Sequence, residues 1–485
     1  MSLKDKILSV LKNKVLLYIS SRYLTYGIQF VNSMFIAIAL GPEFLAVWGF
    51  LNMILQYISQ INFGIPYSLN VLMSINKNDE CRLQALLSTS FWLYGLLSVV
   101  IVLAFSLMEF CGINIGDKYN FNDYAVLIIL IAIITHFNTL LTNYFRVENK
   151  LLEIVFFQSV LPISMLVAII LSKGEELLRL MLWLMFLGQI LSMLIYLKNM
   201  PISLILPNIH DSKLLLKKGL HLFIYNTCFY FIMLTTRSVV SSIYKVEEFG
   251  FFTFSFTLAN TIMLLFDSFS FLIYPKTINR LNQADNDGIF RIMNMIRSLY
   301  ITSVHLVMYV FIILFPVIIR FFPQYNSIFR AFVLMAMTVV LYTNCFAYSS
   351  FLTAKGKEVL LGRLAFVALV INISLSLFIS KVLEADYSFV ILATMVAYVF
   401  YSIMLSKFSY AIIGINKNIL SLIVENFPIR LFAPFFVALF VSILGWSNYC
   451  FVIILVLFII LNWGEIKYIK ESICKVIKEP SIINI

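Results

Sequence analysis

The chain has 485 residues and a net charge of +11 at pH 7; 61% of its residues are hydrophobic, only 12% are charged, and the mean hydropathy is +0.96. Soluble domains average roughly 45–50% apolar and 25% charged residues. The composition therefore excludes an ordinary soluble globular protein, a disordered chain and a nucleic-acid binder. The surplus of apolar residues is explained if lipid surrounds much of the chain.

Apolar stretches of about 20 residues follow one another along the whole chain, and each is long enough to cross a hydrocarbon core of about 30 Å. We predict an all-α polytopic membrane protein with about fourteen transmembrane helices, of which the last two are the shortest. The predicted spans are residues 15–38, 44–74, 83–108, 123–145, 151–172, 177–197, 214–242, 249–275, 295–319, 328–353, 361–380, 388–412, 429–445 and 448–464.

The first span resembles a signal peptide, because lysines precede it and Ala37-Ile38-Ala39 has the form of a cleavage site. Its apolar stretch is too long for a usual signal peptide, so we expect an uncleaved helix. With the N-terminus inside, most of the 35 lysines and arginines fall on the inner loops and the span ends beside them. This bias is the one that the positive-inside rule predicts, and it places both termini in the cytoplasm.

Cysteine and histidine show no ligand pattern. None of the six cysteines falls in a CxxC pair or near one of the four histidines at ligand spacing. The sequence also has no HExxH, GxGxxG or GxxxxGK[ST] motif. We therefore expect no metal site, disulfide framework or cofactor, and a single-chain ATP-driven pump is disfavoured.

Two predicted outer loops repeat one pattern. The loop after the first span reads Leu-Gly-Pro-Glu-Phe-Leu-Ala-Val-Trp over 40–48, and the loop after the seventh reads Lys-Val-Glu-Glu-Phe-Gly-Phe-Phe over 245–252. Aligning Glu43 with Glu247 brings Ala46 onto Gly250. Six spans separate the copies, so two parallel six-helix halves with a central cleft are expected. The predicted domains are a first bundle at 1–213, a second at 214–414, and two additional helices with a cytoplasmic tail at 415–485.

At these loops the chain resembles the polysaccharide (Wzx-type) flippases of the multidrug/oligosaccharidyl-lipid/polysaccharide exporter superfamily. The helix after the second copy fits as well, because it ends in Tyr274-Pro275. The chain departs from the family pattern at Phe44, where an acidic residue is usual, and at Ala46, where glycine is usual. Fourteen spans also exceed the twelve that are common among O-antigen members. The resemblance implies two helical bundles around a cavity that the first two helices of each half line.

Polar residues form stripes on the repeat-related helices, where charges are unfavourable unless they face a cavity or a partner. In the first, second, seventh and eighth predicted spans, the polar residues recur at spacings that place them on one helical face. We interpret these faces as the lining of a water-filled cleft. The candidate substrate-binding residues are Arg22, Tyr26, Gln29, Asn52, Gln56, Asn226, Tyr230, Arg237, Asn260 and Asp267.

Each stripe also has a purely structural explanation. Arg22 and Arg237 can extend to the headgroups, whereas the short side chain of Asp267 favours a cavity or an ion pair. Hydroxyl and amide stripes can hold helices together without a substrate, and we favour that explanation for the stripe that begins at His136. A packed structural role is also favoured for His305.

The resemblance implies a flippase that moves oligosaccharide repeat units on undecaprenyl pyrophosphate across the bacterial cytoplasmic (inner) membrane, for O-antigen, lipopolysaccharide or capsule. The expected partners are the lipid-linked glycan, membrane lipids, a polysaccharide polymerase and a chain-length regulator. Arginine suits such a substrate because its guanidinium donates paired hydrogen bonds to phosphate oxygens. No covalent step is needed, so the protein is not expected to be an enzyme and has no predicted catalytic residue.

Other functions stay open at this stage. A cation-coupled drug exporter of the same superfamily would favour acidic cleft residues, and here arginines outnumber the single buried aspartate. A polysaccharide polymerase usually has a long outer loop, which this chain does not have. A flippase for the cell-wall precursor agrees with the span count, whereas the loop motifs favour the polysaccharide family. A structural membrane protein without transport is the least favoured, because buried polar stripes would be costly without a cleft.

Overall fold

The computed structural model describes residues 14–76, 79–148, 150–200 and 205–478, and within its helices it leaves out the side chains of 14–19, 151–152, 267–276, 279 and 472–478. Over this part of the chain there are helices and no strands, which confirms the predicted all-α class. The longer helices are α2 (Lys14–Gln60), α3 (Ile65–Ile75), α4 (Glu80–Phe110), α5 (Ala125–Val147), α6 (Leu151–Leu171), α7 (Gly174–Lys198), α8 (Ile209–Ile243), α9 (Val246–Gln283), α10 (Asn286–Ile319), α11 (Phe329–Asn344), α12 (Phe346–Ala354), α13 (Glu358–Leu377), α14 (Ile391–Ile413), α15 (Ile419–Asn426), α16 (Ile429–Leu444), α17 (Cys450–Leu461) and α18 (Trp463–Lys478). Short helical turns are η1 (Asp117–Tyr119), η2 (Phe121–Asp123), η3 (Pro323–Ile328), η4 (Phe378–Val382) and η5 (Tyr387–Val390).

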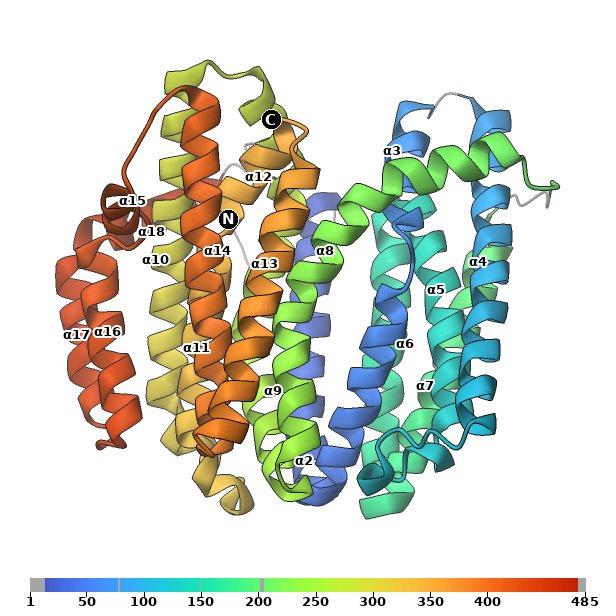
Figure 1. Ribbon diagram of the computed structural model, residues 1–485, viewed down its shortest axis with the longest axis horizontal. Helices are drawn as coiled ribbons and strands as arrows, with labels where there is room; N and C mark the ends of the chain where they lie inside the picture. The colour runs from blue at the N-terminus through green and yellow to red at the C-terminus, as the bar shows by residue number, and fades with distance from the viewer. Residues whose placement is uncertain (1–13, 77–78, 149, 201–204, 479–485) are drawn as a thin grey trace. The chain divides into compact units, whose positions relative to one another are not determined.

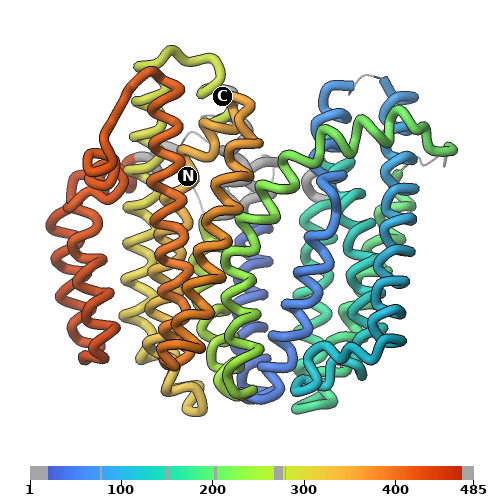
Figure 2. Tube along the Cα trace, viewed as in Figure 1, coloured from blue at the N-terminus to red at the C-terminus, as the bar shows by residue number. Residues whose placement is uncertain are grey.

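The chain forms two compact units. The first comprises residues 1–227 and 244–250, and the second comprises 228–243 and 251–485. The first unit contains α2 to α7, whose helices run alongside one another, and the second contains α10 to α18 (Figure 1). Figure 2 shows α8 continuing as one helix, and its two parts belong to different units. The predicted domain boundaries remain a prediction.

The apolar helices agree with a multi-pass membrane protein. Ten helices of the described part are long and apolar enough to cross a membrane, or up to twelve if each of two bent helix pairs is one span. Each of the fourteen predicted spans overlaps a described helix. One of the ten runs from Ser20 to Gln60 and has 41 residues. At 1.5 Å per residue this is about 60 Å, twice the hydrocarbon thickness. The number fourteen and the inner location of the termini stay predictions.

A kink at Gly41 divides α2 into two helices. Gly41 has φ +70° and ψ 174°, which is not helical, and Pro42 follows it. Proline fits the first turn of a new helix because its missing N–H would have no partner there. The predicted loop between the first two spans is thus reduced to this kink.

The second predicted span is interrupted, which the sequence pattern did not predict. Between α2 and α3 the chain turns through Phe63 and Gly64, with φ +48° and +72°. The Asn62 side chain accepts a hydrogen bond from the Gly64 N–H at 2.9 Å. His136 lies 3.1 Å from the carbonyl oxygen of Ile58 and stacks on Tyr94, with ring centroids 5.5 Å apart. Side chains therefore bond backbone groups that the helix leaves open at this break.

The first part of α8 is held against this break and against α4. A Cβ placed on Gly64 would lie 2.2 Å from the carbonyl oxygen of Gly219, so the two backbones are in direct contact. Asp211, which is buried, accepts two hydrogen bonds of 2.8 Å from the Arg82 guanidinium. A paired geometry of this kind is the strongest form of ion pair between side chains.

Bent helix pairs occur in the second unit. The axes of α15 and α16 differ by 80°, and those of α17 and α18 by 75°. Arg297 donates to the carbonyl oxygens of Glu425 and Asn426 at the first bend, at 3.0 and 3.2 Å. Asn462 donates to the Arg430 carbonyl at 2.9 Å beside the second. Neither α15 nor α18 was among the predicted spans.

The helix α4 has an exposed cysteine at each end. Cys81 lies in its first turn and Cys111 caps its C-terminus. The helix has 31 residues, so it extends over roughly 45 Å. Among the described cysteines, all of which are free, Cys345 is buried and Cys228 and Cys450 are half-buried.

We predict that Gly64→Ala destabilises the protein. The new methyl group would overlap the Gly219 carbonyl, and alanine disfavours a φ of +72°. Overpacking of this kind costs about 1–3 kcal/mol. Thermal unfolding of the detergent-solubilised protein measures the change. Gly27→Ala is the matched control, because nothing lies within 4 Å of a Cβ there. Equal melting temperatures for the two variants would contradict the close contact.

Candidate functional site

The ten predicted substrate-binding residues divide between the two units. Arg22, Tyr26, Gln29, Asn52, Gln56 and Asn226 belong to the first unit, and Tyr230, Arg237, Asn260 and Asp267 belong to the second. Gln29, Gln56, Asn226 and Asn260 are half-buried. The side chain of Asp267 lies outside the described residues. The joint cleft lining remains a prediction.

Arg22 is held by its own helix and by α6. Its Nη2 donates to the Tyr26 hydroxyl at 2.6 Å, and its Nη1 donates to Oε1 of Gln158. The guanidinium carbon lies 4.8 Å from the centre of the Tyr26 ring, within cation–π range. Nε of Arg22 is buried and has no hydrogen-bond partner among the described residues. The side chain is thus fixed in position and retains one free donor.

A polar seam joins α2 to α6, and the sequence analysis did not identify it. The Thr25 and Ser159 hydroxyls are 3.0 Å apart, and the Asn32 amide donates to the carbonyl oxygen of Pro162 at 2.5 Å. Thr25 and Asn32 are each 3% exposed. They are seven residues apart and so lie on one face of α2. Pro162 lacks an N–H and so removes one backbone hydrogen bond of α6 close to this seam.

In the second half of α2, polar side chains bond the backbone of their own helix. Asn52 donates to the Trp48 carbonyl at 2.8 Å, and Ser59 donates to the Leu55 carbonyl at 2.7 Å. Such bonds satisfy side chains locally. The carbonyl side of the Asn52 amide remains a group that a ligand can bond.

In the second unit Arg237 is the most enclosed predicted residue. It is 3% exposed, and its guanidinium carbon lies 4.6 Å from the centre of the Phe256 ring. This contact joins α8 to α9. In the repeat predicted from the two loop copies, these helices correspond to the first and second halves of α2. Tyr230, by contrast, is 39% exposed. The depth of Arg237 in the protein disfavours the alternative that it merely extends to the headgroups.

The face of α8 next to Arg237 is a satisfied hydrogen-bond network. Asn372 donates to the Ile232 carbonyl at 2.7 Å, and the Thr236 and Thr394 hydroxyls are 2.7 Å apart. Asn372 and Thr394 are fully buried. The network joins α8, α13 and α14 and explains why these polar residues occur in apolar helices. It assigns Thr236 a structural role, which the sequence pattern alone did not separate from a cleft role.

The two copies of the repeated loop pattern meet in the first unit. A Cβ on Gly250 would lie 2.0 Å from the carbonyl oxygen of Pro42, so the two backbones touch. Lys118 donates to the Tyr244 carbonyl at 2.9 Å, and the Tyr119 and Phe249 ring centroids are 5.6 Å apart. Burial lowers the pKa of the Lys118 ammonium and raises the pKa of the Tyr119 hydroxyl. These contacts hold the α8–α9 connection against the rest of the first unit. We name this set of contacts the loop contact.

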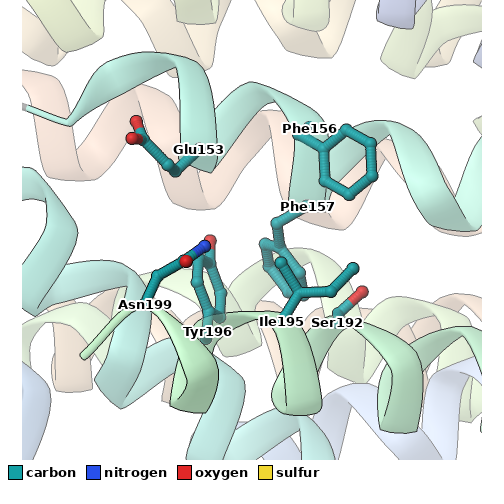
Figure 3. A pocket seen from close by; sticks show the side chains of 7 residues that line it. All are labelled: Glu153, Phe156, Phe157, Ser192, Ile195, Tyr196 and Asn199. Atoms are coloured by element: carbon teal, nitrogen blue, oxygen red, sulfur yellow. The ribbon is translucent and has the colours of Figure 1, made fainter. Parts of the chain in front are cut away.

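A separate side pocket lies between α6 and α7. It has a volume of 330 Å³ and is lined by Glu153, Phe156, Phe157, Ser192, Ile195, Tyr196 and Asn199. Figure 3 shows Glu153 and the two phenylalanines on α6, facing Ser192, Tyr196 and Asn199 across the pocket. None of the predicted substrate-binding residues lines it. The sequence analysis did not identify this pocket because its residues belong to two different spans.

Comparison with solved structures identifies the fold. The lipid II flippase MurJ, in an inward closed conformation, matches with a TM-score of 0.71 and 14% identity over 95% of this chain and 100% of that chain. A multidrug resistance MATE family transporter of the MOP superfamily, facing inward, matches with a TM-score of 0.66 and 14% identity over 83% and 98% of the two chains. An outward-facing MATE structure matches with a TM-score of 0.58 and 16% identity over 83% and 95%.

Neither the family models nor the curated proteins yield a match. The similar structures are transporters and a flippase, not enzymes.

We predict that Arg22 and Gln158 are energetically coupled. Gln158→Leu removes one of the two acceptors of a half-buried guanidinium, which typically costs about 1–3 kcal/mol. Thermal unfolding of Gln158→Leu, Arg22→Met and the double variant gives the coupling energy, expected at about 0.5–3 kcal/mol. Additive effects of the two substitutions would show that the contact contributes nothing.

The apolar helices and the structural matches lead to one conclusion. The chain is a multi-pass membrane protein with the all-helical fold shared by MATE transporters of the MOP superfamily and the lipid II flippase MurJ.

Proposed function

We propose that the chain is a flippase for undecaprenyl-pyrophosphate-linked oligosaccharide repeat units, of O-antigen or capsule type, in a bacterial cytoplasmic membrane. The observation that supports it most is the extent of the structural likeness. The lipid II flippase aligns over its whole length with 95% of this chain, whereas the MATE structures align with 83%. The likeness to a lipid II flippase thus extends over more of this chain than the likeness to MATE transporters, which supports a lipid-linked substrate.

The loop motifs favour the polysaccharide branch. The two copies at 40–48 and 245–252 resemble the loops of Wzx-type flippases, and their backbones touch at Pro42 and Gly250. A contact this close excludes any side chain at Gly250. The position that carries alanine in the first copy, Ala46, therefore carries glycine in the second for a steric reason.

The substrate head group has an anionic pyrophosphate and a polar glycan. In the proposed function Arg22 and Arg237 bind the pyrophosphate, because a guanidinium forms paired charge-assisted bonds with phosphate oxygens. Arg22 supports this role by its buried Nε, which has no protein acceptor among the described residues. Asn52, Gln56, Asn226, Asn260, Gln29, Tyr26 and Tyr230 supply hydroxyl and amide groups for the sugars, and Asp267 balances charge or holds a coupling cation.

Transport in this proposal proceeds by alternating access. The polyprenyl tail stays in the lipid throughout. No bond of the substrate is made or broken, so the activity is transport and not catalysis. The polymerase and chain-length regulator remain predicted partners.

A cell-wall precursor flippase is a second candidate function. The likeness to the lipid II flippase favours it, since that protein is aligned over its full length. The drug exporter is less favoured, because the MATE structures align with a smaller share of the chain.

A deletion strain separates these functions. For the proposed function, lipid-linked repeat units accumulate on the cytoplasmic leaflet and surface polysaccharide is lost. Accumulation of the cell-wall precursor instead would support the second candidate. Normal polysaccharide and normal cell wall with altered drug sensitivity would contradict both, and single units at the surface without polymer would indicate a polymerase.

We predict that Arg237→Gln lowers repeat-unit transport by at least about tenfold, since a charged hydrogen bond contributes roughly 1.5–3 kcal/mol. Arg237→Lys retains the charge but loses the planar fork, so its defect is smaller. Transport is measured as surface polysaccharide in the complemented deletion strain at equal protein levels. Arg363→Gln, at an exposed position of α13, is the control. Normal transport by both Arg237→Ala and Asp267→Asn would refute the assignment of these residues.

A further inference from the structure

A cavity at one end of the second unit is lined by residues from three chain connections. It has a volume of 320 Å³ and lies where the start of α11, η5 and the α16–α17 loop meet. Its polar lining includes Arg330, Asp386, Ser388, Ser442 and Asn448, together with Ser327 and Tyr387, and Trp446 is among its aromatic residues. We name it the Arg330 cavity. All three connections are predicted to lie on the outer side of the membrane, and none contains a predicted substrate-binding residue.

Arg330 is the charged centre of this cavity and has no anionic partner there. The guanidinium carbon lies 5.0 Å from the centre of the Phe389 ring, which orients the group. Among the described side chains no carboxylate forms an ion pair with it. Its Nε is buried and has no hydrogen-bond partner. A half-buried cation without an acceptor is unusual, because buried donors are normally satisfied.

The carboxylate that shares the cavity is bonded to its own turn through one oxygen. Oδ1 of Asp386 accepts hydrogen bonds from the backbone N–H and the hydroxyl of Ser388, at 3.0 and 2.5 Å, and thereby caps η5. Arg330 and Asp386 line the same cavity but do not form an ion pair. The guanidinium therefore retains donors for an additional acceptor.

A second unsatisfied group points to the same conclusion. Ser442 lines the cavity, is 3% exposed, and its hydroxyl has no hydrogen-bond partner among the described residues. Gly445 follows in the left-handed region at φ +68°, and a Cβ there would lie 3.4 Å from Nη2 of Arg330. The turn at Gly445 thus leaves space next to the guanidinium.

The lining specifies the chemistry of a ligand. A guanidinium recognises a carboxylate or phosphate by paired hydrogen bonds. Serine hydroxyls and the Asn448 amide can donate to or accept from ligand hydroxyls. Trp446, which is 54% exposed, offers a flat apolar face. The volume is at the lower end of the range of about 300–1,000 Å³ for ligand pockets, so the ligand is small.

We propose that the Arg330 cavity binds a hydroxylated anion: a carboxylate or phosphate group with neighbouring hydroxyls, as in an acidic sugar or a glycerophosphate headgroup. The anion bonds Arg330, and its hydroxyls bond Ser442 and Asn448. This inference does not depend on the proposed function, since the cavity lies apart from the predicted cleft residues. Trp and Arg also anchor helix ends at the membrane interface. Anchoring alone, however, leaves the buried Nε and the Ser442 hydroxyl without partners.

The test uses the full-length protein in nanodiscs of zwitterionic lipid. Glucuronate and glycerol 3-phosphate are titrated separately by isothermal calorimetry. We expect saturable binding that Arg330→Gln weakens by at least about tenfold, the loss typical of a charged hydrogen bond. Arg330→Lys weakens it less. Arg320→Gln is the matched control, because Arg320 is exposed, follows α10 and also lies on the predicted outer side.

A second arm distinguishes the source of the anion. The wild type and the same variants are purified from membranes that contain phosphatidylglycerol, and the bound lipid is quantified by mass spectrometry. Loss of this lipid in Arg330→Gln, without binding of either soluble anion to the wild type, would identify a headgroup as the occupant. If Arg330→Gln fails to fold, Ser442→Leu replaces it in the test. The leucine side chain fills the cavity and should abolish binding of the anion. Equal behaviour of the cavity variants and Arg320→Gln in both arms would overturn the proposal.

Discussion

Hydrocarbon offers no hydrogen-bond partner, so every backbone group within the membrane has to be bonded by the protein itself. This constraint explains why the described spans are helical and why polar side chains bond the backbone where helices break or bend. At the break between α2 and α3, His136 and Asn62 bond the backbone. At the α15–α16 bend, Arg297 and Asn426 do so. Some of the buried polar residues, such as Asn62, His136 and Arg297, are therefore a consequence of the bends.

The same constraint separates two kinds of polar face on one helix. On α2, Thr25 and Asn32 are bonded to α6, whereas Gln29, which lies beside them on the helix, is half-buried. On α8, Thr236 belongs to a closed network with Asn372, and its neighbour Arg237 turns to Phe256. A satisfied face holds helices together, and a face with remaining donors can bind a ligand. The distinction depends on the neighbours, and a single helix does not reveal it.

This difference sets what could be predicted from the sequence. The spans could be predicted because hydropathy is local, and the loop copies could be aligned because Glu43 and Glu247 keep the same spacing to their aromatic neighbours. The break at Gly64 could not be predicted, because the glycine that contacts it, Gly219, is distant in the sequence. Similarly, Gln158 became relevant only as the partner of Arg22. The Arg330 cavity joins three connections that no sequence pattern relates to one another.

The two exposed cysteines of α4 have a practical consequence. The helix is long enough to reach both headgroup regions, so in the predicted topology Cys81 and Cys111 are native chemical labels on opposite faces of the bilayer. A thiol reagent that cannot cross membranes distinguishes the two compartments without any engineered residue. With the orientation expected from the basic loops, Cys111 reacts in intact cells and Cys81 reacts only after the membrane is opened. The chain thus carries its own marker of which way it is inserted.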